Sequence, residues 1–171
     1  DKWVDAAVNA GYKRNPDYNG ADQEGVGYFQ LTMKGGRRCS SAKAYLSTAR
    51  GRTNLEIISD AQTETVIIND GRAMGLRIRR HGQMETIMAR AEVILSAGAI
   101  GSPQILMLSG IGAGDELSRH GISVVSDLQG VGKNLQDHLQ ARPVFKTTLS
   151  TINTETNNIF KQVIIAAQYA L

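Results

Sequence analysis

The sequence predicts an α/β fold in which a β-meander precedes a buried strand and a helix. The segment 63–68 is rich in β-branched residues, and tight-turn signals at 69–71 and 81–83 reverse the chain into further strands. The apolar run 93–95 has the composition of a buried strand. A helix should follow over 102–109, because proline suits a first helical position and Gly110 suits the position after the last.

The segments before the meander alternate between helix, loop and strand. Residues 1–10 have the spacing of an amphipathic helix that Gly11 can terminate. Beyond them we expect a loop at 15–20, a strand at 26–33, a turn at 34–38, a helix starting at Ser40 or Ser41 and running through Leu46, and a short strand at 54–59.

The meander and the segments after it follow the same reasoning. Its second strand should cover 72–80, and 86–95 should continue outward from the next turn. After the predicted helix we expect a short helix at 115–120 stopped by Gly121, a strand at 122–125, a strand at 141–147, and a helix at 156–171.

Composition excludes several classes of protein. The 171 residues carry a formal net charge of +3 with acidic and basic residues interspersed, which argues against a nucleic-acid-binding protein. No apolar stretch approaches the ~20 residues needed to cross a bilayer. Cys39 is the single cysteine, so the chain can form neither an internal disulfide nor a cysteine metal cluster, and we expect no metal. A single thiol is compatible with a reducing compartment.

The run from Ser96 to Gly112 is the strongest chemical signal. An apolar strand ends in Ala97, Gly98 and Ala99, and a helix starts directly afterwards. Such small residues let a ligand lie against the backbone at a helix N-terminus. The residue types alone leave an alternative open, because the glycines could equally serve turns and close helix–strand packing.

The same run resembles the second signature of the glucose-methanol-choline (GMC) oxidoreductases. The matching positions are Gly98, Ala99, Ser102, Pro103, Ile105, Leu106, Ser109, Gly110, Ile111 and Gly112. Other stretches resemble the bacterial alcohol and choline dehydrogenase branch: 11–12, 19–20, 23–25, 36–38, 40–42 and 130–138. The resemblance therefore covers essentially the whole chain.

The resemblance implies part of an FAD/NAD(P)-binding Rossmann-like domain over about 51–138. Elements of a substrate domain or lid would lie at about 1–50 and 139–171. Members of the family bind FAD and oxidise an alcohol by hydride transfer to the flavin. The cofactor-binding candidates are Thr63 (where the family usually has a valine whose backbone contacts adenine), Ala97, Gly98, Asn134, Asp137 and His138.

Two family motifs are not in this sequence. One is the Gly-x-Gly-x-x-Gly that holds the FAD pyrophosphate, and the other is the region with the catalytic His and its His or Asn partner. We therefore expect an internal piece of a larger FAD-dependent alcohol dehydrogenase. The piece should carry no catalytic residue, should be inactive alone, and should not hold FAD alone.

None of the three histidines matches the catalytic motif. We expect His81 in a hairpin turn and His120 at a helix end, both structural or solvated. Asp137 and His138 form a tempting acid–base pair, but adjacent residues on an extended chain point opposite ways. We expect His138 to have a structural or cofactor-shell role.

One substitution bears on the substrate, a small-molecule alcohol in the larger protein. Choline-directed members tend to carry a glutamate two residues after this Asp-His pair, whereas this chain has Gln140. A neutral amide does not attract a trimethylammonium cation, so a neutral alcohol is favoured over choline.

Three further expectations concern the protein's surroundings. The unpaired strand at 93–95 should promote self-association through exposed apolar surface. The location should be cytoplasmic, with contact to a membrane through the electron acceptor left open. A stand-alone nucleotide- or partner-binding module without catalysis is the alternative function.

Overall fold

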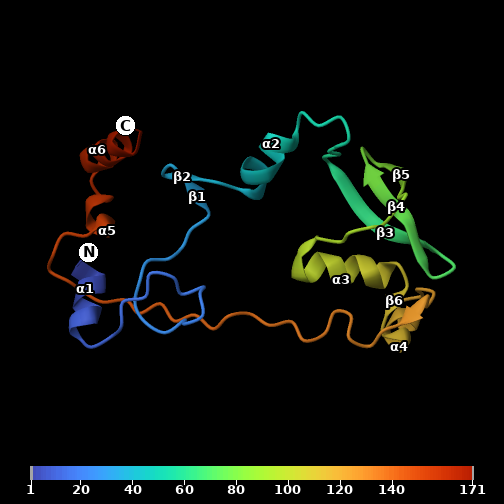
Figure 1. The fold of residues 1–171 in the computed structure, drawn as a ribbon, viewed down its shortest axis with the longest axis horizontal. Helices are drawn as coiled ribbons and strands as arrows, with labels where there is room; N and C mark the ends of the chain where they lie inside the picture. Colours follow the sequence, from blue (N-terminus) through green and yellow to red (C-terminus); the bar gives the residue numbers. More distant parts are fainter. Residues whose placement is uncertain (1, 171) are drawn as a thin grey trace. The chain divides into compact units, whose positions relative to one another are not determined.

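A computed structural model describes residues 2–170, which form two compact units that divide after Ala61 (Figure 1). Each unit is a mixture of helices, strands and irregular segments, so the predicted α/β class is confirmed. The first unit holds α1 (Lys2–Asn9), β1 (Met33–Lys34), β2 (Arg37–Arg38), the π-helix η1 (Ala42–Leu46) and α2 (Ser47–Ala49). The second holds β3 (Ala61–Asn69), β4 (Arg72–Arg80), β5 (Gln83–Met88), α3 (Gly98–Leu108), β6 (Ile111–Gly112), α4 (Gly114–Arg119), β7 (Ser126–Asp127), α5 (Ile152–Glu155) and α6 (Ile159–Ala170).

The β-meander of the second unit has its first two strands where they were predicted, but its third strand, β5, covers Gln83–Met88 rather than 86–95. Its strands lie in the order β3-β4-β5, and β4 pairs antiparallel with β5 from Arg80↔Gln83 onward. Both connections are two-residue turns with positive φ: Asp70 (48°) with Gly71 (74°), and His81 (48°) with Gly82 (78°). Two successive positive φ angles are typical of type I′ hairpins. His81 therefore lies in a hairpin turn, as expected.

A serine joins the meander to α3. The Ser109 hydroxyl donates to the carbonyl of Ile105 (2.6 Å) and accepts the backbone N–H of Val66 from β3 (2.7 Å). The side chains of Val66 and Ile105 are buried beside this link. Gly110 then ends α3 with φ +83°, and a Cβ there would lie 2.4 Å from the carbonyl oxygen of Ser123. Only glycine fits this position, so the exit from α3 is tightly specified.

The start of α3 differs from the prediction. The helix begins at Gly98 rather than at Ser102, so Pro103 lies inside it. The Ser102 hydroxyl accepts the N–H of Ala97 (2.9 Å), and this contact closes the first turn before Pro103 is reached. A proline here costs one helical hydrogen bond, at the carbonyl of Ala99, which a partly exposed first turn tolerates.

Short elements complete the second unit. β6 and β7 pair in parallel, and the carboxylate of Asp127 accepts the N–H of Gly114 (2.9 Å) at the start of α4. Leu117 of α4 is 2% exposed and lies in the core. The predicted helix at 115–120 and its stop at Gly121 (φ +70°) are confirmed. The strand predicted at 122–125 was wrong in position. The strand lies at Ser126–Asp127 (β7), where it pairs with β6.

Four predicted strands are irregular in the structure. No strand forms at 54–59, 93–95 or 141–147. In the segment 26–33, only Met33 belongs to a strand. Val26 makes only an isolated parallel bridge with Arg14. A strand needs a neighbour to complete its hydrogen bonds, and among residues 2–170 no other strand lies beside these segments. β-Propensity alone was therefore not sufficient.

The helices and turns predicted near the two chain ends are largely confirmed. Gly11 (φ +98°) follows α1, and Gly35 and Gly36, both with positive φ, connect β1 to β2. The helix predicted from Ser40 or Ser41 is present as η1 and α2. The helix predicted at 156–171 is α6, preceded by α5, and Leu171 lies outside the described residues.

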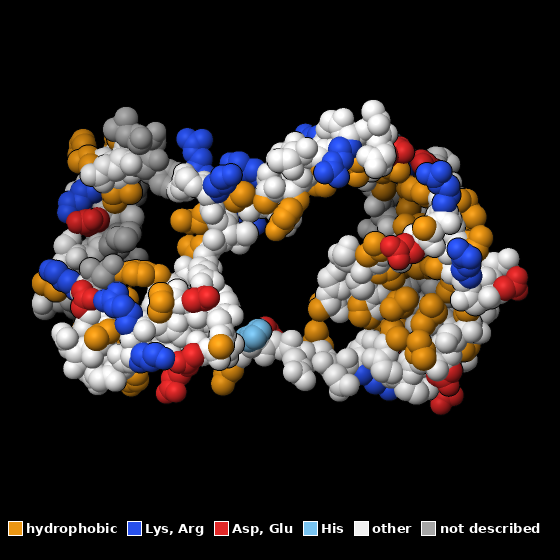
Figure 2. Space-filling model, viewed as in Figure 1, with side chains coloured by type: hydrophobic (Ala, Val, Ile, Leu, Met, Phe, Trp, Pro, Cys, Tyr) orange, Lys and Arg blue, Asp and Glu red, His pale blue; other side chains and the backbone are white. Residues whose placement is uncertain are grey.

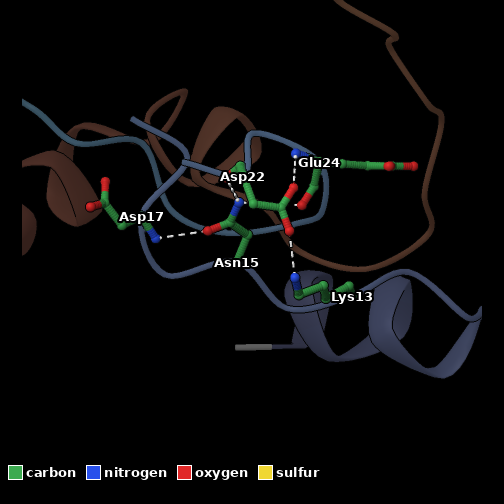
Figure 3. A network of polar contacts seen from close by, with 5 residues as sticks. All are labelled: Lys13, Asn15, Asp17, Asp22 and Glu24. Atoms are coloured by element: carbon green, nitrogen blue, oxygen red, sulfur yellow. Dashed lines mark hydrogen bonds and ion pairs between the residues drawn. The ribbon is translucent and has the colours of Figure 1, made fainter. Parts of the chain in front are cut away.

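A buried asparagine organises the loop after α1 (Figure 3). Asn15 is 8% exposed; its Nδ2 donates to the carbonyls of Asp22 (2.7 Å) and Glu24 (3.2 Å), and its Oδ1 accepts the N–H of Asp17 (2.9 Å). The Lys13 ammonium donates to the Asp22 carboxylate at 2.5 Å. That hydrogen bond, with a second from the Glu24 N–H, lowers the pKa of Asp22 below its ordinary value.

Replacing Ser109 tests the link between the meander and α3. We expect Ser109→Ala to lower the free energy of unfolding by about 1–3 kcal/mol, because the part-buried N–H of Val66 loses its acceptor. Urea denaturation followed by circular dichroism measures this change. Ser118→Ala, at an exposed position in α4, is the control and should change little. Equal losses in the two variants would contradict the assigned role.

Candidate functional site

A groove in the second unit lies between α3, from Ala99 to Met107, and the segment 130–136. Its volume is about 800 Å³, and it is open to solvent. One wall comes from one face of α3 and the other from the irregular segment. The lining residues are Ala99, Ile100, Pro103, Gln104, Leu106, Met107, Gly130, Val131, Gly132, Lys133, Asn134, Leu135 and Gln136.

Backbone amides lie at one end of this groove. Ala97 and Gly98 are exposed at the start of α3, directly before the lining residue Ala99. Gly98 has φ +86°, and a Cβ built there would meet nothing within 4 Å. Glycine is therefore needed for the backbone angle and leaves open space beside it. The first N–H groups of a helix have no partner within the helix, so this end can donate to an oxygen-rich ligand.

Two residues in left-handed backbone conformations shape the opposite wall. Gly132 has φ +76°, and a Cβ there would lie 3.4 Å from Cε of Met107 and 3.9 Å from Cβ of Pro103. Asn134 has φ +57°, a conformation that asparagine adopts more readily than most residues. The N–H of Lys133 donates to the carbonyl of Gly130 (3.2 Å), which closes the turn. These angles hold the segment close against α3.

Three predicted site residues lie beyond the groove in sequence. Asp137, His138 and Gln140 are exposed in an irregular segment and do not line it. The Asp137 carboxylate accepts the backbone N–H of His138 (2.9 Å). Among residues 2–170 no ion pair joins the Asp137 carboxylate to the His138 ring. The structure therefore gives no acid–base dyad at this pair.

Thr63 is separate from the groove. It is half-buried in β3, and its carbonyl accepts a hydrogen bond from Nε2 of Gln62 (3.2 Å). Of the predicted cofactor residues, Asn134 lines the groove, while Ala97 and Gly98 do not line it and directly precede the lining residue Ala99 in the chain.

Sequence reasoning missed most of the α3 wall. The residues Ile100, Pro103, Gln104 and Met107 line the groove from one helix face. Their spacing of three and four residues is the signal that could have identified this face. Our prediction placed the helix start at Ser102, which left Ile100 outside the helix.

The groove suits one part of a dinucleotide cofactor. Exposed amides at the start of α3 can donate to phosphate, ribityl or ring oxygens, and the side chains of Ile100, Met107 and Val131 offer an apolar wall. Asn134 and Lys133 add a neutral amide and a positive charge. Fold and groove together define a segment of an α/β domain with a solvent-open groove of mixed apolar and polar lining.

Comparison with known proteins identifies the family. A family model described as GMC oxidoreductase matches residues 1–140, and the chain belongs to this family. An oxygen-dependent choline dehydrogenase of Rhizobium johnstonii is 47% identical over 138 residues, which is 81% of this chain and 25% of the relative. An alcohol dehydrogenase [acceptor] of Pseudomonas putida is 49% identical over 140 residues, covering 80% of the chain and 25% of the relative. The chain thus spans about a quarter of the length of these relatives.

Solved structures show the same fold. Pyridoxine 4-oxidase from Mesorbium loti superposes with a TM-score of 0.68 at 30% identity, covering 74% of this chain and 25% of that one. Formate oxidase gives a TM-score of 0.64 at 30% identity, covering 78% of the chain and 23% of that one. An FAD-dependent oxidoreductase from Chaetomium thermophilum gives 0.69 at 26% identity, with 75% and 23% covered. The predicted family and fold class are both confirmed.

Three further observations concern the described residues alone. No helix among them is long and apolar enough to cross a membrane. No group of three or more His, Cys, Asp or Glu side chains in residues 2–170 is arranged to hold a metal ion. Cys39 is a half-buried free thiol.

Substitution of Asn134 tests the shape of the groove wall. We expect Asn134→Val to lower the free energy of unfolding by about 1–2 kcal/mol, because a β-branched residue is strained at φ +57°. Backbone amides of 130–136 should then exchange hydrogen faster. Asn134→Gly, which adopts this angle freely, is the matched control and should keep the exchange pattern of the unmodified chain. Identical exchange in the Val variant would show that the left-handed residue does not hold this wall.

Proposed function

We propose that the protein to which this chain belongs is an FAD-dependent oxidoreductase that oxidises an alcohol. The observation that carries the proposal is the groove, built within the stretch that the GMC oxidoreductase model matches. In this proposal residues 51–138 contribute to the FAD-binding domain. Residues 1–50 and 139–171 contribute substrate-domain or lid elements. When bound, the flavin would accept a hydride from the alcohol carbon.

The proposed cofactor contacts use mainly backbone. Gly98 would approach the cofactor through its backbone at the start of α3, next to Ala97, whose N–H is held by the Ser102 hydroxyl, and Asn134 would face it from the other wall. Thr63 would contact the adenine through its backbone on β3. This position tolerates a change of side chain, since the contact does not use one. Asp137 and His138 would lie near the flavin in a longer protein.

The proposed substrate is a neutral alcohol. Gln140 is exposed and uncharged at the position where choline-directed members of the family tend to carry glutamate. Without that charge the coulombic attraction for a quaternary ammonium group is lost. Among the relatives, both choline dehydrogenases and an alcohol dehydrogenase are similar to this chain.

We place the protein in the cytoplasm, where a single free thiol is compatible with reducing conditions.

The isolated chain should lack flavin. The sequence contains no Gly-x-Gly-x-x-Gly loop, which is the motif that holds the cofactor pyrophosphate in the family. We expect the purified chain to show no flavin absorbance in the visible range and no alcohol-dependent reduction of an added dye. Acid precipitation followed by fluorescence of the supernatant checks for released FAD. Stoichiometric FAD in that supernatant would contradict the expected lack of flavin.

The isolated chain should also self-associate. Hydrophobic side chains lie exposed over the meander and α3 (Figure 2). A groove of about 380 Å³ in the same unit is lined by the half-buried side chains of Ile68, Val93, Leu95 and Leu106. A second copy could cover such a surface and remove it from water. Size-exclusion chromatography with light scattering should give a mass above that of a monomer, increasing with concentration. A monomer at every concentration would contradict this expectation.

A further inference from the structure

Asn19-Gly20 in the first unit is the single Asn-Gly pair of the sequence. Asparagine followed by glycine is chemically labile, because glycine has no side chain to hinder attack by its own backbone nitrogen. Both residues are exposed, so water and hydroxide reach them. We propose that Asn19 is a site of spontaneous deamidation whose rate is controlled by the side chain of Gln30.

The reaction balances without any other reagent than water. The backbone nitrogen of Gly20 attacks Cγ of Asn19, the new N–Cγ bond closes a five-membered succinimide, and the Cγ–Nδ2 bond breaks. The amide group leaves as ammonia and takes up the proton that the Gly20 nitrogen gives up. Water then opens the ring at either carbonyl, which yields aspartate or isoaspartate. No group is oxidised or reduced.

The folded loop holds both reacting groups away from each other. Nδ2 of Asn19 donates to Oε1 of Gln30 (2.5 Å), eleven residues along the chain. The N–H of Gly20 donates to the carbonyl of Asp17 (3.1 Å). The carboxamide must leave Gln30 and the nitrogen must leave Asp17 before the ring can close. Deamidation therefore proceeds from a locally opened loop.

The side chain of Gln30 connects the turn at 17–20 to the rest of the loop. Its Nε2 donates to the carboxylate of Asp17 (2.8 Å), and its Oε1 accepts from Asn19. Asp17 is in turn held through its backbone N–H by the buried Asn15 (Figure 3). The turn is thus tied to Asn15, a buried polar side chain of the first unit.

The deamidated chain cannot keep the hydrogen bond between position 19 and Gln30. A carboxylate at position 19 only accepts hydrogen bonds, so it cannot donate to Oε1 of Gln30. Rotating the Gln30 amide would offer the new carboxylate a donor but would turn Oε1 toward the Asp17 carboxylate. Deamidation therefore releases the turn from Gln30, and it adds a negative charge beside Asp17.

Peptide mapping of the chain tests the proposal. Trypsin releases residues 15–34, in which Asn15 precedes Pro16 and has no attacking N–H, so Asn19 is the one reactive asparagine. We expect the mass gain of amide-to-acid exchange at Asn19 during incubation at mildly alkaline pH, slower in the intact chain than in the free peptide. Equal rates in chain and peptide, or no gain in either, would overturn the proposal.

Variants separate the role of Gln30 from general loop stability. Gln30→Ala should accelerate deamidation about five-fold, the factor that corresponds to losing a net hydrogen bond of about 1 kcal/mol. Gln23→Ala, in the same loop and with no side-chain hydrogen bond among the described residues, should leave the rate unchanged. Circular dichroism checks that each variant is folded. Equal deamidation rates in Gln30→Ala and the unmodified chain would overturn the proposal that Gln30 controls the rate.

Discussion

The second unit depends on one polar contact between its two layers. The meander and α3 are separated by 43 residues of sequence at the point where Val66 donates to Ser109. Because β3 is an edge strand, its outward N–H groups have no strand partner, and Ser109 satisfies one of them. The same hydroxyl donates to the carbonyl of Ile105 and so anchors itself to the helix. The contact thereby sets where α3 lies against the meander, and α3 forms one wall of the groove.

The other wall depends on backbone conformations rather than on side chains. Gly132 and Asn134 adopt left-handed angles that bring the segment against Pro103 and Met107. At the opposite end of the groove, Gly98 uses a similar angle to expose the first amides of α3. A groove built in this way presents backbone donors and an apolar wall. That combination suits a large, partly planar cofactor such as FAD.

Some parts of the structure could be predicted from the sequence and others could not. The meander was predictable because Asp70-Gly71 and His81-Gly82 are local turn signals that need no tertiary information. The strands expected at 54–59 and 141–147 were wrong, because β-branched composition does not supply the neighbour that a strand needs.

The same distinction applies to the candidate site. The small residues at 97–98 marked its edge because close backbone approach requires them. The α3 face was missed because the helix start was placed after Ile100. Family membership, in contrast, followed from a long run of matching residues, and the comparisons confirm it.

Hydrogen exchange of the chain tests the central claim most directly, since the groove requires α3 to lie against β3. The amide of Val66 should exchange more slowly than the edge-strand amides of Glu64 and Ile68, because it alone of the three donates to Ser109. Equal exchange at the three positions would contradict the account, since β3 and α3 would then not be joined as described.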